Sequence, residues 1–368
     1  MDITDLRRLF PVTESCVYLN SAAESPLNMR SQALLEEYLS TMSRAPQDKP
    51  GGRSRIRRAL SRLLGGDPDE YALVTSTGVG LGLVASGMQW SPGDNVVIPL
   101  DEHWNNAYPW LNLRRLGVET RIVEPDADMR VTPESVALHV DERTRVVAMA
   151  AVRFNSGFRA DLKAVAEVAR RHGAIFVVDG IQAAGVVPID VVAEGIDVLA
   201  CGGFKWLLGL PGTGFLYVSR RVQPLIHPML PGMFAAENDL RALQFLPDAR
   251  RYETGSLAYP LFYAWEAGLG VLQEAGIAAI HSRAMGLTGR LIAGLRERSI
   301  QLLTPVSTES ERSGIVVFTA GSAEANRDLF ERLRLVNIVV TLRHDTLRVS
   351  PGLFNVAADI DALLSVMS

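Results

Sequence analysis

The chain has 368 residues, of which 48% are hydrophobic and 21% charged, and its formal net charge is -4. This composition excludes a disordered chain, a coiled coil and a collagen-like repeat. The charge gives no net positive field for nucleic acid, so we expect no nucleic-acid partner. Two cysteines are too few for a disulfide scaffold and match no zinc motif, so we expect no metal and a reducing compartment, the cytoplasm.

No segment of the sequence resembles a membrane or export signal. Residues 1–8 lack the apolar stretch of a signal peptide. The longest apolar runs, such as residues 146–152, have the length of a strand and fall far short of the roughly 20 residues that a membrane helix needs. We therefore expect no membrane partner.

Short apolar strands alternate with helical segments through the middle of the chain. Strands are expected at residues 71–75, 95–99, 118–123, 145–152, 174–178, 197–200 and 214–218. Helices are expected at residues 106–116 and 161–172, the second with apolar residues at helical spacing and Gly173 at its C-cap. This alternation predicts a mostly parallel sheet with helices on both faces.

The last hundred residues have a different pattern. Helices are expected at residues 257–274, 277–298, 325–333 and 359–367, and strands at 315–318, 338–342 and 347–350. This order predicts a smaller α+β domain. Residues 228–253 show little periodicity, and a long irregular loop of this kind often carries a function or a partner contact.

Residues 201–218 place a lysine in an uncommon setting. Lys205 follows two glycines at the end of an expected strand, and Phe204 and Trp206 flank it. Glycines let a ligand approach the backbone, and an amine in apolar surroundings has a lowered pKa. Such a lysine can act as a nucleophile that forms a Schiff base. A surface lysine in a glycine-rich loop is the structural alternative.

An acid, Asp179, ends an all-apolar strand, and Gln182 follows it. Ligands of open α/β sheets bind at this edge. A buried carboxylate there needs a cationic partner, and a protonated pyridine nitrogen would be one. A helix N-cap aspartate is the alternative explanation.

Hydroxyl and glycine residues follow the first expected strand. Ser76, Thr77 and Gly78 precede a helix-like segment, where backbone N–H groups and hydroxyls make a phosphate site, although Ser and Thr also simply cap helices. The glycines at 78, 80 and 82 do not have the G-x-G-x-x-G spacing. The sequence therefore gives no support for a nucleotide-binding oxidoreductase.

These three segments, in this order, resemble the class V aminotransferase family of pyridoxal-phosphate (PLP) enzymes, which also includes cysteine desulfurases, isopenicillin N epimerase and kynureninase. The resemblance extends from residues 18–23 to residues 348–350. It implies fold type I: an α/β large domain with a mostly parallel, seven-stranded-type sheet between helices, and a smaller α+β C-terminal domain. The implied boundaries are 16–255 for the large domain, and 1–15 with 256–368 for the small one.

The resemblance implies a pyridoxal 5'-phosphate cofactor and assigns residues to its ring. Lys205 would form the internal aldimine, and Asp179 would pair with the pyridine nitrogen. Gln182 and Asn155 would lie at the ring hydroxyl. In the external aldimine the bonds at the substrate Cα lie beside an electron sink, and the released Lys205 would move a proton there.

The same resemblance assigns residues to the phosphate of the cofactor and to the outer face of its ring. Ser76, Thr77 and Gly78 would hold the phosphate. His103 matches the family's Glu-His segment, so it would stack on the ring; an ordinary loop histidine is the alternative.

The resemblance also implies a small amino-acid substrate and a homodimer with a shared active site. Arg348 matches the arginine that binds the substrate α-carboxylate, since a planar guanidinium suits a carboxylate. Asn20, Ser21 and Ala22 belong to a substrate-side loop. Ser256 matches a hydroxyl residue that reaches the phosphate of the neighbouring subunit.

The sequence leaves the type of reaction open: one leading hypothesis has two alternatives. A single base, Lys205, supports transamination or elimination, whereas epimerisation needs a second acid/base, for which His103 is the candidate. The leading hypothesis is transamination or epimerisation at Cα. The alternatives are a C–S or other β-eliminating lyase, and a non-catalytic PLP-binding protein. Residues 326–347, where desulfurases of the family carry a nucleophilic cysteine, contain none, which disfavours persulfide chemistry.

Three loops are expected to set substrate specificity: residues 20–27, 104–110 and 231–247. Trp104, Phe234 and Phe245 in these loops suggest an apolar pocket.

Overall fold

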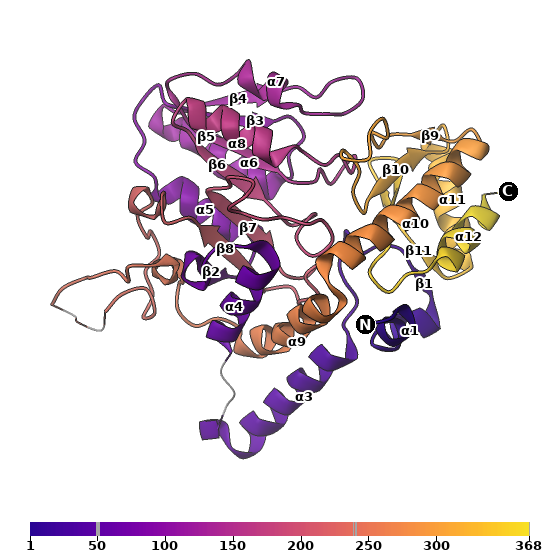
Figure 1. Ribbon diagram of the computed structural model, residues 1–368, viewed down its shortest axis with the longest axis horizontal. Helices are drawn as coiled ribbons and strands as arrows, with labels where there is room; N and C mark the ends of the chain where they lie inside the picture. The colour runs from indigo at the N-terminus through magenta and orange to yellow at the C-terminus, as the bar shows by residue number, and fades with distance from the viewer. Residues whose placement is uncertain (49–51, 238, 240, 368) are drawn as a thin grey trace.

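The computed structural model describes residues 1–48, 52–237, 239 and 241–367. Its centre is a seven-stranded sheet in the order β2-β8-β7-β6-β5-β3-β4 (Figure 1). The strands are β2 Tyr71–Val74, β3 Asn95–Pro99, β4 Glu119–Val123, β5 Thr144–Ala150, β6 Ile175–Asp179, β7 Val198–Gly202 and β8 Gly214–Val218. Only β8 runs antiparallel to its two neighbours. The predicted mostly parallel, seven-stranded sheet is therefore confirmed.

Helices precede this sheet in the chain (α1–α4), lie between its strands (α5–α8) and follow it (α9). They are α1 Ile3–Arg8, α2 Val12–Ser15, α3 Met29–Arg44, α4 Arg53–Leu64, α5 Thr77–Gly87, α6 Trp104–Leu111, α7 Pro133–Ala137, α8 Leu162–Arg171 and α9 Tyr259–Ala275. Short 3-10 turns are η1 Pro46–Asp48, η2 Pro68–Glu70, η3 Asn112–Leu116, η4 Gln223–Leu225 and η5 Ala249–Tyr252.

The strands of the sheet are buried on both faces, and their side chains alternate between two cores. In β6, Phe176 and Val178 pack with residues of α4, α8 and α9. Ile175 and Val177 pack on the other face with residues of α5 and α6. This alternation follows from the two-residue period of a strand, and it explains why the strands are apolar throughout.

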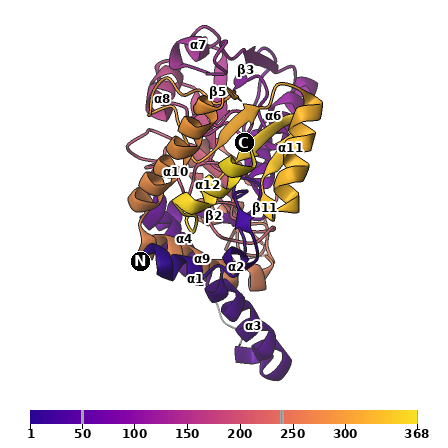
Figure 2. The same cartoon turned by 90° about the vertical axis from the view of Figure 1, so that its right-hand side faces the viewer.

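A smaller antiparallel sheet lies beside the C-terminal helices (Figures 1 and 2). Its order is β12-β13-β10-β9, and a separate pair joins β1 to β11 in parallel. The elements are β1 Val17–Tyr18, β9 Gln301–Leu302, β10 Val316–Thr319, β11 Ile338–Val339, β12 Thr341–Arg343, β13 Thr346–Val349, α10 Ile277–Glu297, α11 Ala323–Leu335 and α12 Ala357–Val366. The predicted domain boundary at 255/256 falls between η5 and α9 and stays a prediction.

Three local expectations need correction. The helix expected at 106–116 begins at Trp104, because the His103 side chain caps it, and it continues as η3 from Asn112. The strand expected at 338–342 is two strands, because β11 pairs with β1 whereas β12 pairs with β13. The C-cap of α8 is His172, and Gly173 follows it with a left-handed φ of 70°.

Among the described residues, no helix has both the length and the apolar character needed to cross a bilayer.

The N-terminal helix α1 packs against the segment that follows β13. The ring of Phe10 lies 4.6 Å from that of Phe354, and both side chains are fully buried. Arg7 donates to the Phe354 carbonyl at 3.1 Å and pairs with Asp359 at 3.0 Å. Residues at the two ends of the chain are thereby held together.

Replacing Phe354 tests how much this contact stabilises the fold. Phe354→Ala should lower the free energy of unfolding by about 3–5 kcal/mol, because it leaves a cavity in a closed core. Urea unfolding measures the change, with Leu335→Ala as the control because Leu335 is exposed on α11. Equal unfolding midpoints for the two variants would contradict the prediction.

Candidate active site

Lys205 lies in a tight turn just after β7. The Gly203 N–H donates to the Thr213 carbonyl at 2.8 Å, and the Lys205 carbonyl accepts from the Leu208 N–H at 3.0 Å. The Lys205 residue is 9% exposed, and its Nζ lies 5.6 Å from the centre of the Phe204 ring. The turn therefore holds the lysine at the carboxyl edge of the large sheet.

The surroundings of Lys205 favour the neutral amine. Burial lowers its pKa to about 8, the positive charge of Arg348 acts in the same direction, and Asp179 opposes both. Within the described chain, no carboxylate oxygen lies within 4.0 Å of Nζ. The lowered pKa makes more of the amine neutral at a given pH than in an ordinary lysine, and the expected role of Lys205 as a nucleophile stays a prediction.

Asp179 ends β6, next to β7, and is 2% exposed. Burial raises the pKa of its carboxyl to about 7, and the nearby Glu102 acts in the same direction. One oxygen accepts from the Ile181 N–H at 2.9 Å, but no described Lys, Arg or His nitrogen lies within 4.0 Å. A buried carboxylate without a cation fits a ligand that carries a positive charge, as a protonated pyridine nitrogen does.

Gln182 connects the lysine turn to the N-terminal loop. Its Nε2 donates to the Ala22 carbonyl at 3.0 Å, and its Oε1 accepts from the Trp206 Nε1 at 3.2 Å. These two bonds fix the amide plane and leave one N–H of the amide for a ligand. The expected contact of Gln182 with a ring hydroxyl stays a prediction.

The expected phosphate residues occupy the N-terminus of α5. Ser76 caps this helix by accepting from the Val79 N–H at 3.2 Å. The Thr77 hydroxyl accepts from the Gly202 N–H at 2.9 Å, which links the loop to β7. A Cβ on Gly78 would lie 3.2 Å from the side chain of Asn105. Free N–H groups, two hydroxyls and a close backbone suit an anion such as phosphate.

His103 and Asn155 both lie next to Phe154, His103 by ring contact and Asn155 by sequence. His103 Nδ1 accepts from the Asn105 N–H at 3.2 Å, so the ring proton is on Nε2. The ring lies edge-on to Phe154 at 5.4 Å. Burial lowers the pKa of His103 to about 4, with Lys205 and Arg343 adding to the shift, so the imidazole is neutral at pH 7. The buried Oδ1 of Asn155 has no hydrogen-bond partner among the described residues, which fits a ligand at this position.

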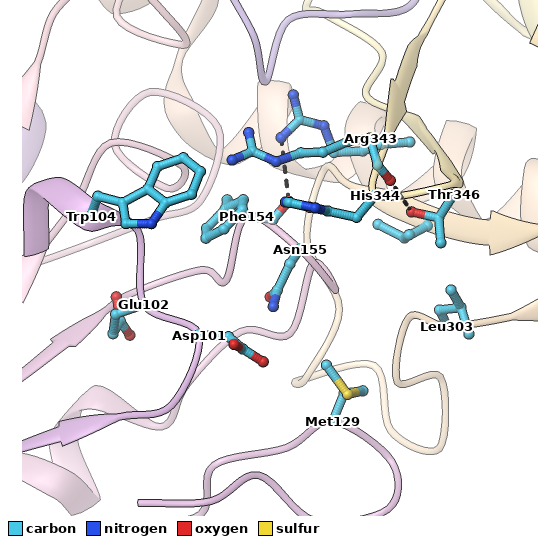
Figure 3. A pocket seen from close by; sticks show the side chains of 12 residues that line it. Asp101, Glu102, Trp104, Met129, Phe154, Asn155, Leu303, Arg343, His344 and Thr346 are labelled. Carbon is cyan, nitrogen blue, oxygen red and sulfur yellow. Dashed lines mark hydrogen bonds between the residues drawn. The ribbon is translucent and has the colours of Figure 1, made fainter. Parts of the chain in front are cut away.

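A cavity of about 390 Å³ opens beside these residues, between the two sheets (Figure 3). Arg348 of β13 lines it and is 4% exposed. Its Nη1 donates to the Phe154 carbonyl at 3.2 Å, whereas its buried Nε has no partner among the described residues. Burial, with Arg343 adding to it, lowers the pKa of Arg348 to about 10, so the guanidinium stays charged at pH 7. The cavity is large enough for a small ligand.

The N-terminal loop joins the small sheet to the site. The Asn20 side chain accepts a hydrogen bond from the Thr341 hydroxyl, and the Ala22 N–H donates to the Ser350 hydroxyl at 3.0 Å. The buried Ser21 hydroxyl has no partner among the described residues. Ser256 is exposed on the loop between η5 and α9, so its expected role toward a second subunit stays a prediction.

The expected specificity loops contribute unequally to the cavity. Trp104 lines it, but no described residue of 20–27 or 231–247 does. Phe234 instead lies under the guanidinium of Arg53 at 3.9 Å, and Phe245 packs edge-on against His227. The two phenylalanines therefore do not form this pocket within the described part of one chain.

Sequence reasoning missed two residues of the site. Glu102 is buried, and its two oxygens accept from the Ala150 N–H at 3.0 Å and the Asn106 side chain at 2.9 Å. Its position before His103 was the available indication. Arg343 lines the cavity with Arg348, and only the pairing of β12 with β13 brings it there.

The described residues contain no cluster of three or more acidic, His or Cys side chains that could hold a metal.

The fold and the site together define an α/β protein with a buried lysine and a buried aspartate at the carboxyl edge of its large sheet. The family model for aminotransferase class-V matches residues 17–363, and the chain belongs to this family.

Proteins similar to this chain carry several names. A probable cysteine desulfurase of Methanothermobacter thermautotrophicus is 31% identical over 80% of this chain and 76% of that protein. The isopenicillin N epimerase of Streptomyces clavuligerus is 28% identical over 95% and 94%. An uncharacterized aminotransferase of Bacillus subtilis, YcbU, is 27% identical over 95% and 93%.

Solved structures share the fold. The apo cysteine desulfurase of Thermococcus onnurineus NA1 superposes with a TM-score of 0.90 at 23% identity, covering 99% of this chain and 96% of that one. A C-DES mutant with glycine covalently linked to its PLP cofactor also gives 0.90, at 21% identity, with 98% of each chain covered. The family match and this cofactor-bound neighbour indicate a PLP cofactor, as the sequence predicts. The buried Asp179 carboxylate without a cation and the unpartnered Oδ1 of Asn155 fit it.

The lysine turn has no room for a larger residue at Gly203. A Cβ there would lie 2.6 Å from Thr213 Oγ1 and 2.8 Å from the Trp265 ring. Gly203→Ala should therefore displace the turn, destabilise the fold by about 1–3 kcal/mol and weaken cofactor uptake. Thermal unfolding and absorbance after PLP addition measure both effects.

Gly286→Ala is the matched control, because Gly286 is exposed on α10 and its added Cβ would meet nothing within 4 Å. It should leave cofactor uptake unchanged and stabilise the helix slightly. Normal cofactor uptake by Gly203→Ala would show that the turn tolerates the methyl group.

Proposed function

We propose that this protein is a PLP-dependent enzyme that moves a proton at the Cα of a free amino acid and performs transamination. The observation that carries the proposal is the grouping at one site of three buried charged groups without ion-pair partners in the described chain: Lys205, Asp179 and Arg348. Lys205 fits the aldehyde of the cofactor, Asp179 fits its pyridine nitrogen, and Arg348 fits the α-carboxylate of the substrate. A non-catalytic PLP-binding protein would have no need of Arg348.

We assign the cofactor-holding residues as the sequence suggests. Asp179 would face the pyridine nitrogen, and the N-terminus of α5 the phosphate. Asn155 and Gln182 would contact the ring hydroxyl, and His103 would cover the ring face. When bound, PLP supplies an electron sink that weakens the bonds at the substrate Cα.

The chain's own residues then determine what happens at Cα. Arg348 binds the α-carboxylate and so fixes which bond is broken. Lys205, whose pKa is lowered to about 8, would accept the proton from Cα and could return it to the cofactor carbon bonded to the substrate nitrogen, two bonds away. Epimerisation would need a second acid/base on the opposite side. The pKa of His103, about 4, makes it a weak base at pH 7, which favours transamination.

A β-eliminating lyase is the second candidate, because it uses the same lysine and arginine and because relatives of this chain are named cysteine desulfurases. Transfer of sulfur through a thiol is not supported. Cys201 is 1% exposed, burial raises the pKa of both Cys201 and Cys16, and neither lines the cavity. Release of pyruvate and ammonia from an amino acid would identify the lyase, whereas release of a 2-oxo acid with the aminated cofactor would identify the transaminase.

The assembly and the compartment are part of the proposal. The exposure of Ser256 suits a hydroxyl that acts on a second subunit, so we propose a homodimer with shared active sites. The two free cysteines suit a reducing compartment, and we propose the cytoplasm.

The lysine assignment can be tested by absorbance. The protein with PLP should show a visible band that borohydride abolishes, and reduction should leave the cofactor covalently attached to Lys205. Lys205→Ala should lack this attachment. Lys163→Ala is the matched control because Lys163 is exposed on α8. A protein that stays colourless with added PLP would overturn the proposed function.

The lowered pKa of Lys205 predicts a pH dependence of cofactor uptake. Only the neutral amine attacks PLP, so uptake by the cofactor-free protein should accelerate with rising pH and level off above about 8. Because Arg348 helps to lower this pKa, Arg348→Gln should move the midpoint to higher pH. Absorbance traces across the pH range measure it, and a midpoint near the ordinary lysine value of about 10.4 would contradict the prediction.

A further inference from the structure

A second arginine faces the same cavity as Arg348. The β12–β13 hairpin pairs Thr341 with Arg348 and Arg343 with Thr346. Paired residues of antiparallel strands, and residues two apart on one strand, point to the same face of a sheet. Arg343 and Arg348 therefore share a face, and both line the cavity. Figure 3 shows Arg343 close to Phe154 on the cavity wall.

The guanidinium of Arg343 packs on aromatic rings instead of pairing with an acid. Its Cζ lies 4.4 Å from the centre of the Phe154 ring and 5.6 Å from that of Trp104. In the described part of the chain, no carboxylate oxygen approaches it within 4.0 Å. Contact with ring faces leaves the N–H edge of a guanidinium free to bind an anion through two parallel hydrogen bonds.

Two of the three acids around the hairpin have other partners. Both oxygens of Glu102 accept hydrogen bonds from other groups, and Asp345 pairs with Arg327 at 3.0 Å. Asp101 also lines the cavity; it is exposed, forms no ion pair within 4.0 Å among the described residues, and acts electrostatically on the buried Arg153. The β12–β13 hairpin therefore brings two guanidiniums without ion-pair partners in the described chain to a cavity whose lining also holds Asp101 and Glu102. A single α-carboxylate would bind only one of the two guanidiniums.

The hairpin turn holds Arg343 in place before any ligand binds. His344 and Asp345 have φ values of 45° and 55°, the left-handed conformation of a two-residue turn. The Asn326 side chain donates to the Asp345 carbonyl at 2.8 Å, and the Arg327–Asp345 pair fixes the same residue. A fixed backbone reduces the freedom that Arg343 loses when it binds a ligand.

We propose that Arg343 binds a second carboxylate, at the far end of the substrate side chain, while Arg348 binds the α-carboxylate. The substrate class is an amino acid with two carboxylates. The inference rests on the proposed function, because that function places the α-carboxylate on Arg348. The aromatic rings of Phe154 and Trp104 would pack on the apolar part of the side chain between the two charged ends.

Binding of unreactive acids tests the subsite without turnover. Calorimetry would compare glutarate, with two carboxylates, and butyrate, with one, on the PLP-loaded protein and on the protein freed of cofactor. We expect glutarate to bind about 10- to 100-fold more tightly, the range of a hydrogen-bonded charged pair. Arg343→Gln should reduce this ratio to about 1, and Arg343→Lys should retain part of it because it keeps the charge but loses the planar fork.

Arg334→Gln is the control for loss of a positive charge. Arg334 is exposed on α11 and pairs with Glu331, so this variant should keep the wild-type ratio. An equal affinity of the wild-type protein for glutarate and butyrate would overturn the proposal. So would a ratio in Arg343→Gln that matches Arg334→Gln, provided that Arg343→Gln takes up PLP with the wild-type absorbance.

A spectral titration with glutamate and glutamine gives a second readout. These amino acids differ in the distal charge and have nearly the same shape. Wild-type holoenzyme should respond at a lower concentration of glutamate, and Arg343→Gln should remove the difference. A cofactor-loaded enzyme without this preference overturns the subsite alone. A protein that takes up no PLP overturns the proposed function, and the glutarate preference of the cofactor-free protein then still decides the subsite.

Discussion

The burial of a lysine and an aspartate at neighbouring strand ends is the constraint on which the rest of the site depends. Asp179 ends β6 and Lys205 follows β7, so the pairing of these two strands sets their separation. Burial raises the pKa of the acid and lowers that of the amine, which means that neither charge is well compensated by the protein. Burying such groups costs free energy, and their retention at one site is typical of a functional centre.

The remainder of the chain holds this pair against displacement. The turn of Lys205 is closed by backbone bonds and by the Trp265 indole, which donates to the Leu207 carbonyl at 2.9 Å. Gln182 connects the same turn to Ala22, and the neighbouring Asn20 bonds to the small sheet through Thr341. The N-terminal loop therefore links the turn of Lys205 to the small sheet, whose Arg348 lines the cavity. A displacement of the small sheet would move Arg348 relative to Lys205.

Much of the large sheet and of its chemistry could be predicted from the sequence. The strands β3 and β8 have the predicted bounds, because each is an apolar run between clear turn residues. The lysine and the aspartate were recognisable because Lys205 stands between two aromatic residues after two glycines, and Asp179 ends an all-apolar strand. The loops 231–247 were less predictable: an aromatic residue in an irregular segment does not reveal what it packs on, and Phe234 lies under Arg53.

Arg343 could not be found in this way, and the reason lies in the hairpin. The residues at its turn, His344 and Asp345, are not the Asn-Gly type that predicts a two-residue turn, although both adopt left-handed φ values. Without that turn, residues 338–342 read as one strand, and the position of Arg343 opposite Thr346 is invisible. The position of Arg343 matters because it adds a second guanidinium to the cavity that Arg348 lines. Arg343 and Arg348 line one cavity without ion-pair partners in the described chain, their charges act on the nearby Lys205, and Asp101 and Glu102 are the acids of the described lining. Two guanidiniums without ion-pair partners in one cavity favour a ligand that carries two carboxylates.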